Sequence, residues 1–251
     1  MSLTKKKADA KTATPEISVV ILCYQEGQRL FSFVGQTIEV LESLVVEWEI
    51  ILVANYWNHQ DDDTPRVAKQ IAAQRPNIRV VTRLKAGGMG WDARSGLKES
   101  SGAFICLIDG DGQMPPESIT DVYTKIKSEK LDFVMTYRTE RGDSWLRKIN
   151  SYTYNLAFRI LFPSVRVRDA NSKPKILTRE AYSRMSLNAS DWFLDAEMLI
   201  QCARMKLSMA EVPVTFDKCL NRKSFVKLDA IFEFIKNLVS ARIKEYFIKK
   251  D

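Results

Sequence analysis

The stretch "ICLIDGDGQMPPE", residues 105–117, is an apolar run that stops at two carboxylates, Asp109 and Asp111, separated by one glycine. In an open parallel α/β sheet, ligands bind beyond the carboxyl ends of the strands. Residues i and i+2 of an extended chain point the same way, so both carboxylates can converge on one divalent cation. A simple turn with polar side chains facing water is the competing interpretation of these residues.

Two features around this stretch narrow its interpretation. A calcium EF-hand loop is excluded, because its sixth and twelfth positions would be Met114 and Thr120 instead of glycine and glutamate. The following "PPES" predicts the start of a helix, with Ile119, Val122 and Ile126 facing inward.

Further apolar, β-branched runs alternate with helical patterns along the chain. Leu30, Phe33 and Val34 fall close to one face of a helix predicted over 28–44. Short hydrophobic strands separated by amphipathic helices predict an α/β fold with a mostly parallel central sheet flanked by helices. The predicted strands are 17–24, 49–55, 78–83, 103–109 and 132–138, with a later short strand at 208–216.

A glycine-rich segment, "LKAGGMGWDARSGLKESSGAF" at 84–104, precedes the central strand. Its glycines, Gly88 among them, come before a helix that carries Arg94, a layout suited to holding a phosphate near backbone N–H groups. The segment is neither a Walker loop nor a G-x-G-x-x-G motif, since no Gly-Lys-Ser/Thr follows and Ala93 takes the place of the third glycine.

Composition limits the partners and the compartment. The net charge of +7 over 251 residues suggests anionic partners, but no zinc pattern or RNA-binding signature supports nucleic acid. The four cysteines are scattered, which favours a reduced, cytoplasmic protein. No run approaches the length of a membrane span, so any membrane contact is expected at the surface of the inner face. The only histidine, His59, is expected in a solvated loop.

Taken together, these segments resemble the family 2 glycosyltransferases with the GT-A fold, in particular the dolichyl-phosphate mannose synthase-like branch that acts on polyprenyl phosphates. The matching pieces include "ISVVILCYQE", residues 84–117, "DANSKPKIL", "FLDAEML" and "EVPVTF". Residues 84–117 are the most specific part. The resemblance implies an inverting transfer from a nucleotide-sugar, with Mg²⁺ or Mn²⁺ as cofactor.

The resemblance also implies roles for particular residues. Tyr24 and Glu26 correspond to the strand end that receives the base and ribose of the donor, and Asp109, Asp111 and Gln113 correspond to the segment that binds the metal and the donor diphosphate. Arg138 corresponds to an arginine near the donor and acceptor phosphates. The sugar and acceptor region corresponds to Asp169, Asn171 and Ser172. The chain departs from the family at three places, one of which is "NRKSFVK", where Arg222 and Ser224 stand without the family's glycine between them. Asn55 stands where an aspartate recognises the base, and Lys173 stands where the family has glycine.

Three functions remain open at this stage. The first is transfer to a polyprenyl phosphate, an anion that needs no general base. The second is transfer to a hydroxyl in cell-surface polysaccharide synthesis, for which Asp195 or Glu197 would be the base. Either acid can instead pair with a nearby arginine or cap another element. The third is an inactive GT-A-like scaffold.

The predicted organisation is one domain with appendages. A disordered basic tail is expected over 1–15, the glycosyltransferase domain over 16–220, and an amphipathic helical appendage over 221–251. The aromatic and basic residues of 145–162 and of the last helix suit both packing on the domain and contact with anionic headgroups. The oligomeric state is not predicted.

Overall fold

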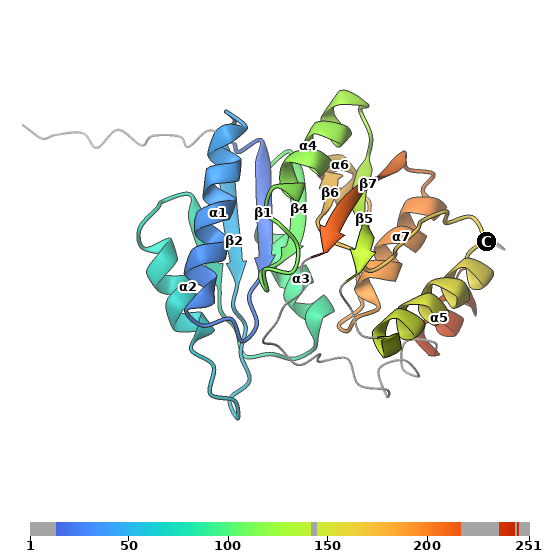
Figure 1. Cartoon of the computed structure of the whole chain (residues 1–251), viewed down its shortest axis with the longest axis horizontal. Coiled ribbons are helices and arrows are strands. Elements are labelled where there is room, and N and C mark those ends of the chain that lie inside the picture. The colour runs from blue at the N-terminus through green and yellow to red at the C-terminus, as the bar shows by residue number, and fades with distance from the viewer. Residues whose placement is uncertain (1–13, 142–144, 217–235, 244, 246–251) are drawn as a thin grey trace, which may run out of the picture.

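The computed structural model describes residues 14–141, 145–216, 236–243 and 245 (Figure 1). Seven strands form one sheet in the order β3-β2-β1-β4-β6-β5-β7. The strands are β1 (Ile17–Leu22), β2 (Trp48–Val53), β3 (Ile78–Val81), β4 (Phe104–Asp109), β5 (Phe133–Arg141), β6 (Lys175–Thr178) and β7 (Met209–Phe216). The helices are α1 (Arg29–Ser43), α2 (Thr64–Ala72), α3 (Met89–Glu99), α4 (Ser118–Ser128), α5 (Trp145–Leu161), α6 (Arg179–Ser183) and α7 (Leu194–Arg204).

The predicted α/β class is confirmed, and each predicted strand is present. Among the described strands, β6 alone runs against its neighbours, because it pairs antiparallel with both β4 and β5. This strand was not predicted. Its four residues begin with a charged side chain, Lys175, and are too few to show a periodicity.

The sheet is buried on both faces, as its continuous apolar strands require. Along β1, Ile17, Val19 and Ile21 pack into the core layer under α1, α2 and α4, whereas Val20 and Leu22 pack into the layer under α3, α5 and α7. The predicted inward residues of α4 are fully buried in the first of these layers. This sandwich of helices, sheet and helices leaves the strand ends as the place for a site.

Gly96 lets helix α3 pack directly against the strands of the sheet. A Cβ built on Gly96 would lie 2.5 Å from side-chain atoms of both Val20 and Val53. Since both valines are buried on central strands, neither has room to move away.

We expect Gly96→Ala to lower the free energy of unfolding by about 1–3 kcal/mol, because the added methyl group overpacks this contact. Gly35→Ala on α1 is the matched control, since a Cβ there meets nothing within 4 Å. The control should raise stability by up to about 1 kcal/mol through helix propensity. Urea denaturation of the two variants measures both effects, and equal stability would refute the packing account.

The C-terminal part of the chain is helical where it is described, over 236–243 and at 245. Leu238 is fully buried in the core layer that also contains α7. The carboxylate of Glu245 forms an ion pair with the guanidinium of Arg204 on α7 at 3.0 Å. The predicted tail over 1–15 and the start of the predicted appendage over 221–235 fall almost entirely outside the described residues. Within the described part of the chain, no helix combines the length and apolar character needed to span a bilayer.

Candidate active site

The ends of three strands bring the predicted site residues to one edge of the sheet. Leu22, the last residue of β1, is level with Val53 of β2 and with Asp109 of β4. Because these strands are parallel, the segments that follow them leave the sheet on the same side. Tyr24, Asn55 and Asp111 therefore all lie just beyond this edge.

Asp109 and Asp111 stand at the end of β4 as predicted. The side chain of Asp109 is 36% exposed, and Asp111 Oδ1 accepts a hydrogen bond from the backbone N–H of Gln113 at 3.0 Å. Gly110 keeps the turn tight, since a Cβ there would lie 3.0 Å from the carbonyl oxygen of Leu22.

Among the residues described, no group of three or more His, Cys, Asp or Glu side chains is arranged to hold a metal ion. The two carboxylates nevertheless fit a Mg²⁺ or Mn²⁺ ion, because Mg²⁺ is commonly held by one or two carboxylates together with substrate phosphates. The oxygen donors of Asp109, Asp111 and Gln113 suit such a hard ion. The metal roles of these three residues remain a prediction.

Tyr24 and Glu26 lie in a loop tied to the first residue of α2 and to the residues before it. The Tyr24 hydroxyl donates to the side-chain carbonyl of Gln60 at 2.5 Å, and the backbone N–H of Glu26 donates to the Thr64 hydroxyl at 2.9 Å. The Glu26 carboxylate, itself buried, pairs with Arg29 at 3.2 Å. The two loops that would face a nucleoside are thus connected by side chains.

Asn55 is fully buried and committed to neighbouring protein groups. Its amide nitrogen donates to Asp92 Oδ1 at 2.9 Å and to the Ser95 hydroxyl at 3.1 Å, and its oxygen accepts from the backbone N–H of Arg83 at 2.8 Å. Asp92 also pairs with the buried Lys85. Asn55 therefore joins β2 to α3, and its predicted contact with a base would compete with three hydrogen bonds.

The environment of Lys85 was missed by sequence reasoning. Its ammonium lies 4.6 Å from the ring centroid of Tyr24 and 6.0 Å from that of Trp57, a cation–π arrangement. Burial raises the pKa of Asp92 above its ordinary value, although Lys85 and Asn55 act in the opposite direction. Nearby His59 is exposed, as predicted.

Gly88 and Arg94 have close protein partners. A Cβ on Gly88 would lie 3.3 Å from the carbonyl oxygen of Ser190, and one on Gly90 would lie 2.5 Å from that of Asp191. Arg94 donates to the carbonyl oxygen of Asn188 at 2.5 Å. These glycines thus let the segment before α7 pack against the start of α3, and the predicted phosphate roles of Gly88 and Arg94 remain predictions.

Arg138, on β5, is held by the loop before β6. Its Nε and Nη2 donate to the two carboxylate oxygens of Asp169 at 2.6 and 3.0 Å, and Asp169 is buried. The buried Ser172 hydroxyl lies 2.7 Å from that of Thr136, whereas Asn171 is exposed. A bidentate pair of this kind fixes the plane of the guanidinium group.

Asp195 is buried between two lysines. Its Oδ1 accepts from Lys175 at 2.7 Å and its Oδ2 from Lys173 at 3.0 Å, while the Lys173 ammonium also lies 3.5 Å from Asp109. Burial alone would raise the pKa of Asp195, but the two ammonium groups hold it below its ordinary value. Sequence reasoning missed both lysines as partners of this carboxylate.

Glu197 has a structural partner in the segment before α7. Its carboxylate accepts hydrogen bonds from the backbone N–H groups of Asn188 and Ala189 at 2.9–3.0 Å. This contact agrees with the interpretation of Glu197 as an acid that caps another element.

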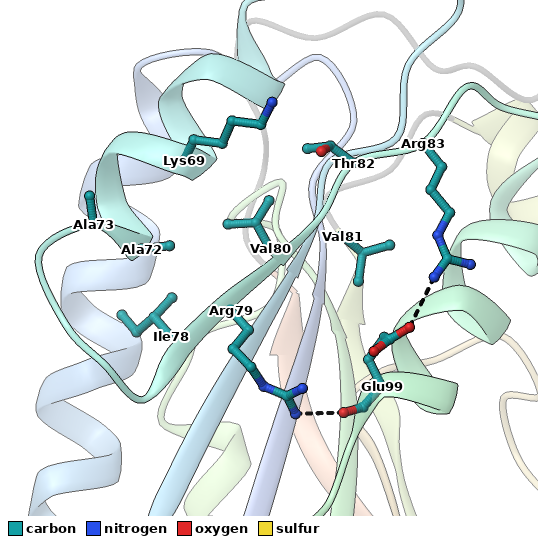
Figure 2. Close-up of a pocket in the computed structure, with 10 residues that line it drawn as sticks. All are labelled: Lys69, Ala72, Ala73, Ile78, Arg79, Val80, Val81, Thr82, Arg83 and Glu99. Carbon is teal, nitrogen blue, oxygen red and sulfur yellow. Dashed lines mark hydrogen bonds and ion pairs between the residues drawn. The ribbon is translucent and has the colours of Figure 1, made fainter. Parts of the chain in front are cut away.

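A groove with a volume of about 710 Å³ lies elsewhere, beside the edge strand β3 (Figure 2). Glu99 at the end of α3 accepts from Arg79 through its carbonyl oxygen at 2.5 Å and from Arg83 through its carboxylate at 2.9 Å. None of the predicted site residues lines this groove.

Comparisons with known proteins show the family and the fold of this chain. The sequence model of "Glycosyl transferase family 2" matches residues 18–191. A dolichol-phosphate mannosyltransferase of Pyrococcus furiosus is 28% identical over 233 residues, which cover 89% of this chain and 62% of the relative. An undecaprenyl-phosphate 4-deoxy-4-formamido-L-arabinose transferase of Edwardsiella ictaluri is 33% identical over 143 residues, which cover 55% of this chain and 42% of the relative. The chain thus spans less than two thirds of either relative.

A solved structure has the same fold. Glucosyl-3-phosphoglycerate synthase from Mycobacterium tuberculosis, crystallised with Mn²⁺, UDP and glucosyl-3-phosphoglycerate, superposes with a TM-score of 0.67 at 20% identity. The match covers 92% of this chain and 80% of that one. At this identity, the likeness establishes the architecture alone.

Proposed function

Since this chain belongs to glycosyl transferase family 2, we propose that it transfers a sugar from a nucleotide-sugar donor to a polyprenyl phosphate. The observation that carries the proposal is the carboxylate pair Asp109 and Asp111, at the strand edge where parallel α/β sheets bind ligands. Relatives named for dolichol phosphate and undecaprenyl phosphate acceptors support the choice of acceptor.

The state of Asp195 favours an anionic acceptor over a hydroxyl. A hydroxyl acceptor needs a base that can take its proton, but both oxygens of Asp195 are occupied by lysines and the residue is 1% exposed. The other acid considered, Glu197, is bonded to backbone N–H groups. A phosphate oxygen attacks without losing a proton, so the reaction proceeds without either acid.

In the proposed reaction, the acceptor phosphate oxygen forms a bond to the anomeric carbon while the bond from that carbon to the donor diphosphate breaks. Inversion at the anomeric carbon follows from this single displacement. Asp109 and Asp111 would hold a divalent cation, which when bound offsets charge on the leaving diphosphate. Arg138, oriented by Asp169, would face the phosphates and stabilise their charge.

The face formed by α5 and the helix at 236–243 is proposed to rest on the cytosolic surface of the membrane. The helix at 236–243 lies near the end of α5, since the Arg242 guanidinium lies 6.0 Å from the ring centroid of Phe162, the residue after α5. Ile160 and Ile243 are 69% and 53% exposed, beside the exposed Arg159. Apolar side chains flanked by basic ones suit a helix lying among anionic headgroups.

The experiment follows labelled sugar from candidate UDP-, GDP- and CDP-sugars in the presence of Mn²⁺, with vesicles that contain polyprenyl phosphate. Label should enter the lipid fraction as a phosphodiester of inverted anomeric configuration. Vesicles without polyprenyl phosphate are the control, and 3-phosphoglycerate is offered separately as a soluble hydroxyl acceptor. Label in the soluble product alone would contradict the proposed polyprenyl phosphate acceptor. An absence of transfer from every donor would contradict the proposal that the chain is a glycosyltransferase.

A further inference from the structure

Four charged side chains form a continuous row from the core to the candidate donor site. Lys175 lies 2.7 Å from Asp195, Asp195 lies 3.0 Å from Lys173, and Lys173 lies 3.5 Å from Asp109. The first three side chains are 0–3% exposed, whereas that of Asp109 is 36% exposed. The row therefore places a buried ammonium group directly behind a carboxylate that solvent can reach.

The antiparallel strand β6 accounts for this contact. Leu107 of β4 is paired with Lys175, the first residue of β6, so Lys173 lies two residues before β6 and Asp109 two residues beyond the last residue of β4 that is paired with β6. The chain has lysine at the position where the resembling family has glycine. By this resemblance, the ammonium group is expected to be a departure of this chain from the family pattern.

The charges of the row determine how much negative charge Asp109 presents to a ligand. Lys175 and Asp195 form one neutral pair, so the charge of Lys173 is available to Asp109. Lys173 thereby offsets one negative charge that Asp109 would otherwise present to a ligand. Because Lys173 is buried, salt screens this effect much less than it would screen a surface pair.

We propose that Lys173 is a charge-compensating residue of the donor site, which weakens the binding of free divalent metal and supports nucleoside diphosphate binding when metal is absent. The inference rests on the proposed function for the nucleotide. A site that is less negative by one charge attracts a divalent cation less and repels a diphosphate less. The metal enters such a site most readily together with the phosphates of its ligand.

The test uses Lys173→Met, which removes the charge and keeps an unbranched side chain of similar size. The variant should fold, because the neutral pair of Lys175 and Asp195 remains and Asp109 is open to solvent. Lys173→Gln is a second variant in case methionine disturbs packing. Lys125→Met is the matched control, since Lys125 lies on the surface of α4 and pairs with Glu129.

Two affinities are measured. The first is Mn²⁺ binding to the protein alone, followed by the loss of the free Mn²⁺ electron paramagnetic resonance signal. Lys173→Met should bind Mn²⁺ about tenfold more tightly than the wild-type chain, a change typical of groups that contact a metal ligand. The second is the Kd of UDP, GDP or CDP, measured once in EDTA and once in Mn²⁺. The Kd in EDTA divided by the Kd in Mn²⁺ should rise by a similar factor in the variant.

An unchanged Mn²⁺ affinity in both Lys173 variants, or an unchanged Kd ratio, overturns the inference. So does an equal change in Lys125→Met. If no nucleoside diphosphate binds the wild-type chain with or without Mn²⁺, the proposed function fails, while the Mn²⁺ titration of the protein alone still decides the role of Lys173.

Discussion

Asp111→Asn should lower kcat/KM for sugar transfer by about 10²–10³-fold, the effect of removing one group that stabilises charge developing in a transition state. Asp111 is one of two carboxylates at the end of β4, and the amide keeps its size but not its charge. The loss should appear mainly in kcat, because the charge on the leaving diphosphate is greatest in the transition state. Steady-state kinetics at saturating Mn²⁺ measure this change.

Asp121→Asn is the matched control, because it makes the same chemical change at an exposed position on α4. Its activity and thermal unfolding midpoint should stay close to those of the wild-type chain, since surface substitutions usually alter stability by about 0.5 kcal/mol or less. An Asp111→Asn variant with wild-type kcat/KM would show that the carboxylate pair does not serve the reaction, and the scaffold interpretation would then regain weight.

The sequence predicted the fold well where the chain obeys simple periodicity. The run that ends at Asp109 had to be a central strand, because an uninterrupted apolar run is stable only with both faces covered. Ile119, Val122 and Ile126 likewise had to face inward from a helix, and they do. The strand β6 had no such signal, since a four-residue segment that starts with Lys175 has no pattern to distinguish it from a loop.

The location of the candidate site residues could be predicted from the sequence, but the protein groups that they contact could not. Asp109 and Tyr24 follow strands, so their place at one edge follows from the parallel sheet. Asn55, Arg94 and Asp195 each make contacts with distant segments, and these depend on how α3 and α7 pack. No spacing in the sequence indicates those contacts.

Lys173 shows most directly which contacts cannot be predicted from the sequence. Its replacement of a glycine was visible in the sequence, but its position beside Asp109 depends on the antiparallel register of a strand that was not predicted. A buried charge must find a partner, so a charged residue in an otherwise matching loop indicates that an unidentified partner exists. The partner itself became known only when the strands were paired.

Asp195→Asn should lower the free energy of unfolding by about 3–5 kcal/mol, the usual effect of removing one member of a buried ion pair. The amide leaves the buried ammonium of Lys175 without a counter-charge, and Lys173 keeps only Asp109. Burial already lowers the pKa of Lys175, despite the opposing effect of Asp195. Removal of the Glu129 carboxylate from its partly exposed pair with Lys125, by Glu129→Ala, should change stability by at most about 0.5 kcal/mol.

A double-mutant cycle separates this charge effect from a change in packing. If the missing charge causes the loss, Asp195→Asn combined with Lys175→Met should be less destabilised than the sum of the single variants by at least about 1 kcal/mol, because the double variant no longer buries an unpaired ammonium. Urea denaturation of the four proteins gives this coupling. Strict additivity would mean that Asp195 acts through shape alone, and would remove the electrostatic reason for treating Lys173 as the counter-charge of Asp109.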